Sequence, residues 1–276
     1  NNNNNNNNDN VDNKQQQHLV LIAMMAGDGR STPPPADGIP LETLQRFDDA
    51  IAAIKSVDAP ALSKLLQLSI APTLIGLRHV STKTLLHFAI ETGNTVIIGK
   101  LLDVGADPFV QDKWGKTALH YAASLDEAAA LAVICEVPGR AYRSRIGELR
   151  RIKDFEGLIA LHYAARARTT NVAISSLLQN IPGVDDDGIA QLHIEDAIGS
   201  TALHYAAEAA NDDGVLHLVN SGARVNHSNN IGNTPLHRAC RKGNEPTARL
   251  LIQLNVLLQL LIQLNVLLQL LIQLNA

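Results

Sequence analysis

Three adjacent histidine–tyrosine pairs are the residues of this chain whose chemistry first suggests catalysis. They are His120–Tyr121, His162–Tyr163 and His204–Tyr205. A histidine beside a phenol could act as a general acid and base near neutral pH. Each pair, however, lies in the same short sequence: GKTALHYAA at 115–123, GLIALHYAA at 157–165 and GSTALHYAA at 199–207. An enzyme does not usually need its active site three times, so the repetition favours a structural role.

The remaining sequence contains no recognisable catalytic or ligand motif. A glycine-rich phosphate loop, an HExxH zinc motif and a GxSxG nucleophile turn are all absent. The run DDDG at 185–188 lacks the alternating oxygen ligands of a calcium loop, which favours a solvated turn. Cys135 and Cys240 lack metal-site spacing, and we interpret them as buried, reduced thiols. We therefore expect no enzymatic activity, metal, cofactor or small-molecule substrate.

Composition points to helices that pack through aliphatic side chains. Hydrophobic residues make up 46% of the 276 residues, but aromatic residues only 3%, so Leu, Ile, Val and Ala must supply the core. The net charge of −4 is unlike the basic surface of a nucleic-acid binder, and we expect no nucleic-acid partner.

The chain is built from repeats about 33 residues long. One position, the first of a Thr-x-Leu-His sequence, recurs at spacings of 33, 42, 42 and 33 residues, at Thr84, Thr117, Ile159, Thr201 and Thr234. A fixed period of this length predicts a solenoid of one supersecondary unit, with nine extra residues in two of the intervals.

Each repeat has the same expected anatomy. Two residues before the threonine position stands a glycine suited to a tight turn, or Thr82 in the first repeat. These glycines are Gly115, Gly157, Gly199 and Gly232. The threonine then caps a short helix, a polar turn follows, and a second helix ends near a glycine such as Gly105.

These sequences resemble the ankyrin repeat. The resemblance is carried by TLLHFAI (84–90), TALHYAA (117–123 and 201–207), TPLHRAC (234–240), VGADP (104–108) and SGARVN (221–226), and it covers 81–255. Residues 41–80 fit a divergent first repeat or N-terminal cap, with helices near 47–55 and 60–68. The resemblance implies an all-α solenoid of stacked helix-turn-helix units with short β-hairpin fingers. It also implies that the repeated histidine bonds backbone groups within and between repeats.

Two segments lie outside the repeats. Residues 1–40 are an Asn/Gln-rich tail and a Pro/Gly linker that we expect to be disordered, with a prion-like assembly role as an alternative. Residues 256–276 are a duplicated Leu/Gln-rich tail, since LLIQLNVLLQ (250–259) recurs at 260–269. Leucine favours a helix there, whereas the alternating pattern favours a strand that could self-associate through 250–276. The Gln and Asn residues make membrane insertion costly, so we expect no membrane span.

Partner binding is expected at the tips of the fingers. The residue before each finger glycine is Trp114, Glu156 (beside Phe155), Ile198 or Ile231, and most of these are apolar where the fold should expose them. Trp114 is flanked by Asp112 and Lys113, which suggests an interface anchor. The alternative is that Trp114 packs against the next finger.

The two extensions carry opposite charges. Residues 137–154 include Arg143 and Arg145, and residues 181–196 include Asp186. They could pair with each other, but our hypothesis is that they help to select a partner, because loops on a rigid scaffold can vary freely.

The sequence therefore predicts a non-catalytic adaptor or scaffold that binds another protein. We place it inside the cell, in the cytoplasm or alternatively the nucleus. The main alternative is the interaction module of a larger enzyme, ion channel, acyltransferase or transcriptional regulator. A gene-model fragment without a stable product is a third possibility.

Overall fold

The computed structural model describes residues 40–68, 71–79, 81–135, 142–167, 172–179 and 189–274. It divides the chain into two compact units, one within 1–122 and 132–141 and the other within 123–131 and 142–276. The helices α7 (Ala118–Ser124) and α8 (Ala128–Cys135) each contribute residues to both. The predicted disorder of the N-terminal tail concerns residues outside the described part of the chain.

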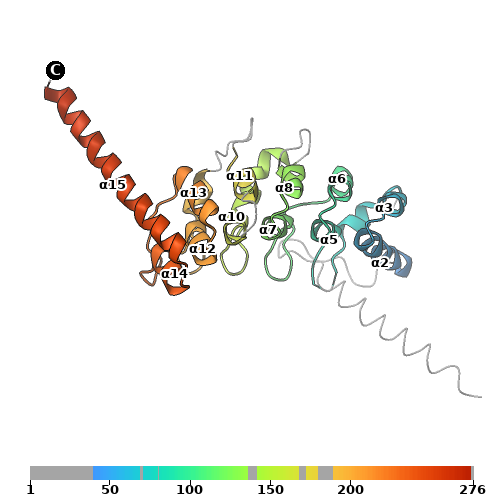
Figure 1. Cartoon of the computed structure of the whole chain (residues 1–276). Coiled ribbons are helices and arrows are strands. Elements are labelled where there is room, and N and C mark those ends of the chain that lie inside the picture. Colours follow the sequence, from blue (N-terminus) through green and yellow to red (C-terminus); the bar gives the residue numbers. More distant parts are fainter. Residues whose placement is uncertain are drawn as a thin grey trace, which may run out of the picture. The chain divides into compact units, whose positions relative to one another are not determined.

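Unit 1 consists of stacked antiparallel helix pairs (Figure 1). The helix α2 (Leu41–Lys55) packs against α3 (Ala59–Leu66) and α4 (Ala71–Gly76), and then against α5 (Leu85–Glu91), which pairs with α6 (Thr95–Asp103). The first helix starts six residues before the predicted boundary, because Leu44 and Phe47 add a further buried turn after Pro40. The Asn94 carboxamide caps α6 by accepting the backbone N–H groups of Val96 and Ile97 at 3.0 and 3.1 Å.

Unit 2 continues the same architecture. Its helix pairs are α10 (Ala160–Arg166) with α11 (Val172–Leu178), α12 (Ala202–Ala209) with α13 (Asp212–Asn220), and α14 (Pro235–Arg241) with α15 (Glu245–Leu274). The 3-10 turns η2 (Arg143–Arg145) and η3 (Ile189–His193) and the helix α9 (Ile146–Arg151) belong to the two extensions. The inner helices α10, α12 and α14 pack on one another in order. The helical solenoid predicted from the sequence is confirmed.

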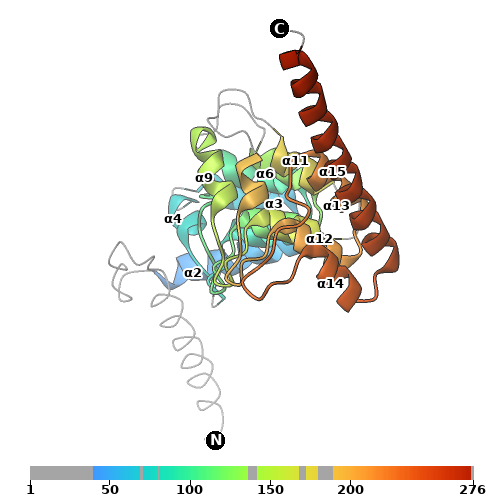
Figure 2. The ribbon, with the colours of Figure 1, turned by 90° about the vertical axis from the view of Figure 1, so that its left-hand side faces the viewer.

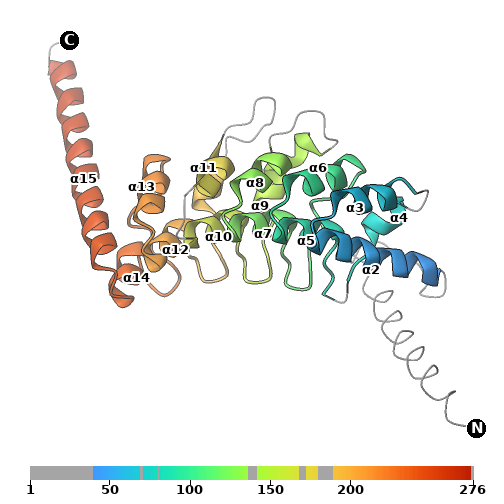
Figure 3. The same cartoon turned by 45° about the vertical axis from the view of Figure 1, so that its right-hand side comes forward.

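The fingers are tight turns, and no residue in the described ranges is assigned to a strand. In unit 2 the turns before α10, α12 and α14 emerge on the same side of the inner helices (Figure 3). Each turn is linked to the one before it by a backbone hydrogen bond: Ala197 N–H donates to Glu156 C=O at 3.1 Å, and Asn230 N–H donates to Ile198 C=O at 3.0 Å. This single backbone hydrogen bond between neighbouring fingers fixes their relative position but does not make a β-sheet.

The glycine two residues before the threonine position lies in the predicted tight turn, and its backbone is left-handed. At Gly157 φ is +81°, and a β-carbon there would lie 2.6 Å from the backbone nitrogen of Ala197 in the next finger. Glycine is therefore required both by φ and by the close approach of the neighbouring turn. In the first repeat Thr82 adopts the same region with φ of 59°.

The repeated histidine joins successive repeats. In His204, Nδ1 accepts the backbone N–H of Thr201 at 3.1 Å, and Nε2 lies 3.0 Å from the carbonyl oxygen of Asn233 in the next finger. This arrangement needs a neutral ring protonated at Nε2. His87 and His162 make the same bonds, to the carbonyls of Lys116 and Ser200. The histidine of the last repeat, His237, is exposed.

Both extensions supply side chains that cap the end of α11. Arg150 is fully buried and donates to the carbonyls of Gln179 at 3.1 Å and Ser176 at 3.2 Å. Gln191, also fully buried, donates to the carbonyl of Leu177 at 2.8 Å. The last carbonyls of a helix lack partners within the helix, and these two side chains replace the glycine ending that this repeat lacks.

The last helix runs far beyond the repeat to which it belongs. In Figures 1 and 2, α15 extends well past α13 and α14. The duplicated tail is thus helical through Leu274, as leucine content predicted, and not a strand. Within the described residues, the segment Glu245–Asn265 has the length and hydropathy of a membrane-spanning helix, although the sequence led us to expect none.

Candidate partner-binding groove

The histidine–tyrosine pairs, for which the sequence predicted a structural role, belong to contacts that hold the repeats together. Tyr205 donates its hydroxyl to the Asp196 carboxylate at 2.5 Å, and its ring packs edge-on against His162 of the previous repeat with centroids 5.5 Å apart. Both nitrogens of His204 are bonded to backbone groups of its own and the next repeat. The two adjacent residues therefore serve different structural networks, and neither offers a free proton-transfer group.

Burial fixes the protonation of both residues. It lowers the pKa of His204 from its usual 6.5 to about 4, although the hydrogen bond to Asn233 acts in the opposite direction. Burial also raises the pKa of Tyr205, and the hydrogen bond to the Asp196 carboxylate raises it further. The imidazole is thus neutral and the phenol protonated at physiological pH.

The tyrosine bond belongs to a repeated finger structure. In the finger before α12, Asp196 Oδ1 accepts the backbone N–H groups of Ile198 and Ser200 at 2.9 and 2.8 Å, while Oδ2 accepts the hydroxyl of Tyr205. Asp112 and Asp154 make the same three bonds in their own fingers. Asp112, predicted to contact a partner, is 4% exposed, so its carboxylate is a structural part of the finger.

The other predicted tip residues are exposed. In unit 2, Phe155, Ile198 and Ile231 occupy successive fingers and are 45% to 76% exposed. In unit 1, Trp114 is also exposed, and the Lys113 ammonium lies 4.4 Å from the centre of its ring. The structure thus brings the three apolar tips of unit 2 into adjacent turns.

The role of the extension residues in partner selection stays a prediction. Arg145 is exposed and forms an ion pair with Glu148 at 2.9 Å within the same segment. Arg143 lies in the turn η2, and its side chain is outside the described atoms. Asp186 lies outside the described residues. Of the two cysteines, Cys135 is buried as expected, but Cys240 is exposed.

A groove of about 560 Å³ lies on unit 2 beside Ile198, in the finger before α12. Its walls come from two fingers and the inner helices α10, α12 and α14. The lining residues are Glu156, Leu158, Arg166, Ile198, Tyr205, Glu208, Ala209, Arg238, Arg241 and Lys242.

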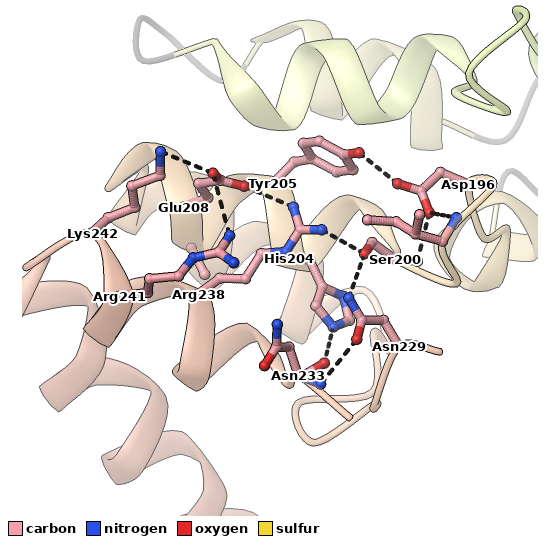
Figure 4. Close-up of polar contacts among 12 residues, drawn as sticks. Asp196, Ser200, His204, Tyr205, Glu208, Asn229, Asn233, Arg238, Arg241 and Lys242 are labelled. Carbon is pink, nitrogen blue, oxygen red and sulfur yellow. Dashed lines mark hydrogen bonds and ion pairs between the residues drawn. The ribbon is translucent and has the colours of Figure 1, made fainter. Parts of the chain in front are cut away.

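An ion network forms one wall of this groove (Figure 4). The Arg238 guanidinium, only 5% exposed, donates to Glu208 Oε2 at 2.7 Å and to the Ser200 hydroxyl at 2.7 Å. Lys242 and Arg241 approach the other oxygen of Glu208 at 3.2 and 3.8 Å. Burial disfavours the charged form of Glu208, but the hydrogen bond from Lys242 and the charge of Arg238 outweigh it and lower its pKa.

This network was not predicted from the sequence, although the sequence contains a signal for it. Arg238 stands where the three preceding repeats have tyrosine, and Asn229 stands where their fingers have aspartate. Both members of the Tyr–Asp pair therefore change together in the last repeat. Asn229 keeps the two backbone bonds of the finger and donates to Ser200 at 3.0 Å, which helps to place the hydroxyl that binds Arg238.

The described residues include no cluster of histidine, cysteine or acidic side chains that could hold a metal ion. What unit 2 offers instead is a groove beside exposed fingers on a rigid stack of helix pairs. Repeat solenoids present extended concave surfaces of this kind for binding.

Comparison with known proteins identifies the family. Residues 51–139, 141–229 and 189–260 match the family described as ankyrin repeats (3 copies), so the chain belongs to the ankyrin-repeat family. Members of this family are generally non-catalytic modules for protein–protein interaction.

Several curated proteins share these repeats. Human Rabankyrin-5 is 33% identical over 174 residues, which cover 55% of this chain and 14% of that protein. Human neurogenic locus notch homolog protein 1 is 31% identical over 158 residues, or 57% of this chain and 6% of that protein. The NF-kappa-B p105 subunit of Gallus gallus is 29% identical over 180 residues, covering 64% and 17%. The chain thus spans less than a fifth of each of these relatives.

Proposed function

We propose that this protein is a non-catalytic adaptor that holds a partner protein against its finger tips and its concave groove. The observation that carries the proposal is the row of exposed apolar side chains at the tips of successive fingers, Phe155, Ile198 and Ile231. Phe155 lies one position earlier in its finger than the other two, because Glu156 directly precedes Gly157. The fold does not need these side chains, because the finger is built by its aspartate and glycine. Exposed apolar residues that recur on a rigid scaffold are typical of protein interfaces.

Ile198 connects the two proposed binding elements, since it is both a finger tip and a groove residue. A partner that contacts the tips would therefore extend onto the inner helices. Trp114, with Lys113 above its ring, is the corresponding anchor in unit 1. We place the adaptor inside the cell, in the cytoplasm or the nucleus, where both cysteines would remain reduced.

The proposal is tested by proximity labelling with the full chain and with a variant that combines Phe155→Ser, Ile198→Ser and Ile231→Ser. We expect a specific set of labelled proteins to be lost in this variant while its thermal unfolding stays close to that of the wild type. Val96→Ser is the matched control, because Val96 is equally exposed but lies outside the fingers. An unchanged labelling pattern in the triple variant would refute binding at the tips.

A second function is favoured by the lengths of the relatives. Since the similar proteins are several times longer, the repeats could be the interaction part of a larger enzyme, channel, acyltransferase or transcriptional regulator. Reading the complete open reading frame distinguishes this alternative from a free-standing adaptor.

A further inference from the structure

We propose that the groove of unit 2 binds a short acidic segment of the partner protein, whose carboxylates contact Arg241 and Lys242. This inference rests on the proposed function and specifies the chemistry of the partner at one place. Four features of the groove support it, and each is a property of residues that line it.

The first feature is the sign of the charge in the groove. Its lining contains four cationic side chains, Arg166, Arg238, Arg241 and Lys242, against the two carboxylates of Glu156 and Glu208. The groove therefore has a net charge of +2, whereas the whole chain has a net charge of −4. A local charge opposite to that of the molecule would attract and orient an acidic segment.

The second feature is that one carboxylate holds three cations. The side chain of Glu208 is 25% exposed, and its Oε2 oxygen accepts a hydrogen bond from Arg238. Lys242 and Arg241, with side chains 51% and 56% exposed, share the other oxygen, and Arg241 is too far for a hydrogen bond at 3.8 Å. An ammonium has three donors and a guanidinium five, so both cations keep N–H groups that a second carboxylate could accept.

The third feature is that the cations are held in place before any partner arrives. Arg238 is fixed by Glu208, by Ser200 and by the face of Tyr205, whose ring centre lies 5.0 Å from the guanidinium carbon. Because Arg238 orders Glu208, it also fixes the carboxylate oxygen that Lys242 contacts at 3.2 Å. Groups ordered in advance lose less conformational freedom on binding.

The fourth feature is the apolar part of the lining. Leu158, Ala209 and the tip residue Ile198 lie in the same groove as the cations. A segment that fits both parts carries an aliphatic side chain next to its carboxylates. A nucleic-acid strand fits less well, because its continuous phosphate charge would also face Glu156 and Glu208.

The experiment selects phage-displayed random peptides on the immobilised full chain and measures the selected peptides by fluorescence anisotropy. We expect enrichment of Asp and Glu next to an aliphatic residue. The double variant Arg241→Glu/Lys242→Glu should weaken binding of these peptides at least about tenfold, and added salt should weaken wild-type binding. Both side chains are half exposed, so the variant should fold normally.

Two further variants sharpen the test. Arg249→Glu reverses an exposed cation on α15 that does not line the groove, and it should change affinity by less than about twofold. Glu208→Gln removes the competing carboxylate while keeping the side-chain shape. It should lower the thermal stability, because buried Arg238 loses its partner, yet tighten the binding of acidic peptides.

The results separate this inference from the proposed function. Selected peptides without acidic enrichment, or acidic peptides that bind the double variant as tightly as the wild type, overturn the inference but leave a peptide-binding adaptor. Equal displacement by a single-stranded oligonucleotide also overturns it, since the site would then bind any polyanion. If no peptide is selected, the acidic-segment inference is wrong, and the labelling experiment on the tip variant still decides the adaptor function.

Discussion

Mild acid should destabilise this protein through its buried histidines, and His162 allows the effect to be measured for one residue. Burial lowers the pKa of His162 from 6.5 to about 4, although its hydrogen bond to the Ser200 carbonyl and the charge of Asp196 act in the opposite direction. The ring is neutral, with Nδ1 accepting the backbone N–H of Ile159 at 3.1 Å. A proton on Nδ1 would face that N–H directly.

The sign and size of the effect follow from the two pKa values. The folded pKa lies below the unfolded one, so between pH 6.5 and about 4 the unfolded chain binds more protons. Stability is therefore complete above pH 6.5 and falls as the pH drops through this window. For one such histidine, going from pH 7 to pH 5 should remove roughly 2 kcal/mol of unfolding free energy. His87, whose pKa burial also lowers to about 4, adds a loss in the same direction.

The assay is urea unfolding of the full chain, followed by far-ultraviolet circular dichroism at pH 7 and pH 5. The variant His162→Gln has no titrating ring at this position, so it should lose roughly 2 kcal/mol less than the wild type between the two pH values. Carboxylates titrate in both proteins and cancel in the comparison. His237→Gln is the control, because His237 occupies the same repeat position with an exposed ring, and it should behave as the wild type. Equal pH dependence of wild type and His162→Gln would refute the argument.

Three further substitutions test other parts of the structure by the same unfolding measurement. Gly157→Ala should destabilise by at least about 2 kcal/mol more than Gly232→Ala, because both glycines have positive φ but only at Gly157 does an added β-carbon meet the next finger; similar losses would contradict the finger contact. Tyr205→Phe should cost about 1–2 kcal/mol by removing the hydrogen bond to Asp196, and a neutral result would mean that the finger does not need this bond. Arg150→Met should cost about 2–3 kcal/mol, because it leaves two carbonyls at the end of α11 without their donor; a loss below about 0.5 kcal/mol would show that the extension does not cap the helix.

The repeat itself could be predicted from the sequence because its determinants are local. The turn glycine, the capping position and the histidine recur at fixed offsets, so the tight turn at Gly157 followed from its position alone, whereas the left-handed conformation of Thr82 is seen only in the structure. The pairing of histidine with the next repeat also followed, since the family resemblance implied it and the period supplied the partner.

The partners of charged side chains could not be predicted in the same way. Arg150 was one arginine in a basic extension, and its acceptors are carbonyls 26 and 29 residues further along the chain. Asp112 was expected at the surface because it neighbours Trp114, yet its bonds to two backbone N–H groups and Tyr121 hold it inside the finger. Glu208 and Arg238 lie in different repeats, and only the folded stack shows that they meet.

The capping of α11 by Arg150 and Gln191 has a consequence for protein engineering. The two extensions are part of the structure of this repeat, because each one supplies a side chain that donates hydrogen bonds to the last carbonyls of α11. Deleting the extensions to give every repeat the same length would leave buried carbonyl groups without hydrogen-bond donors. Moving α10 and α11 into a designed solenoid would therefore require both extensions as well. The smallest segment of this region that could be transferred to another protein is thus longer than one repeat.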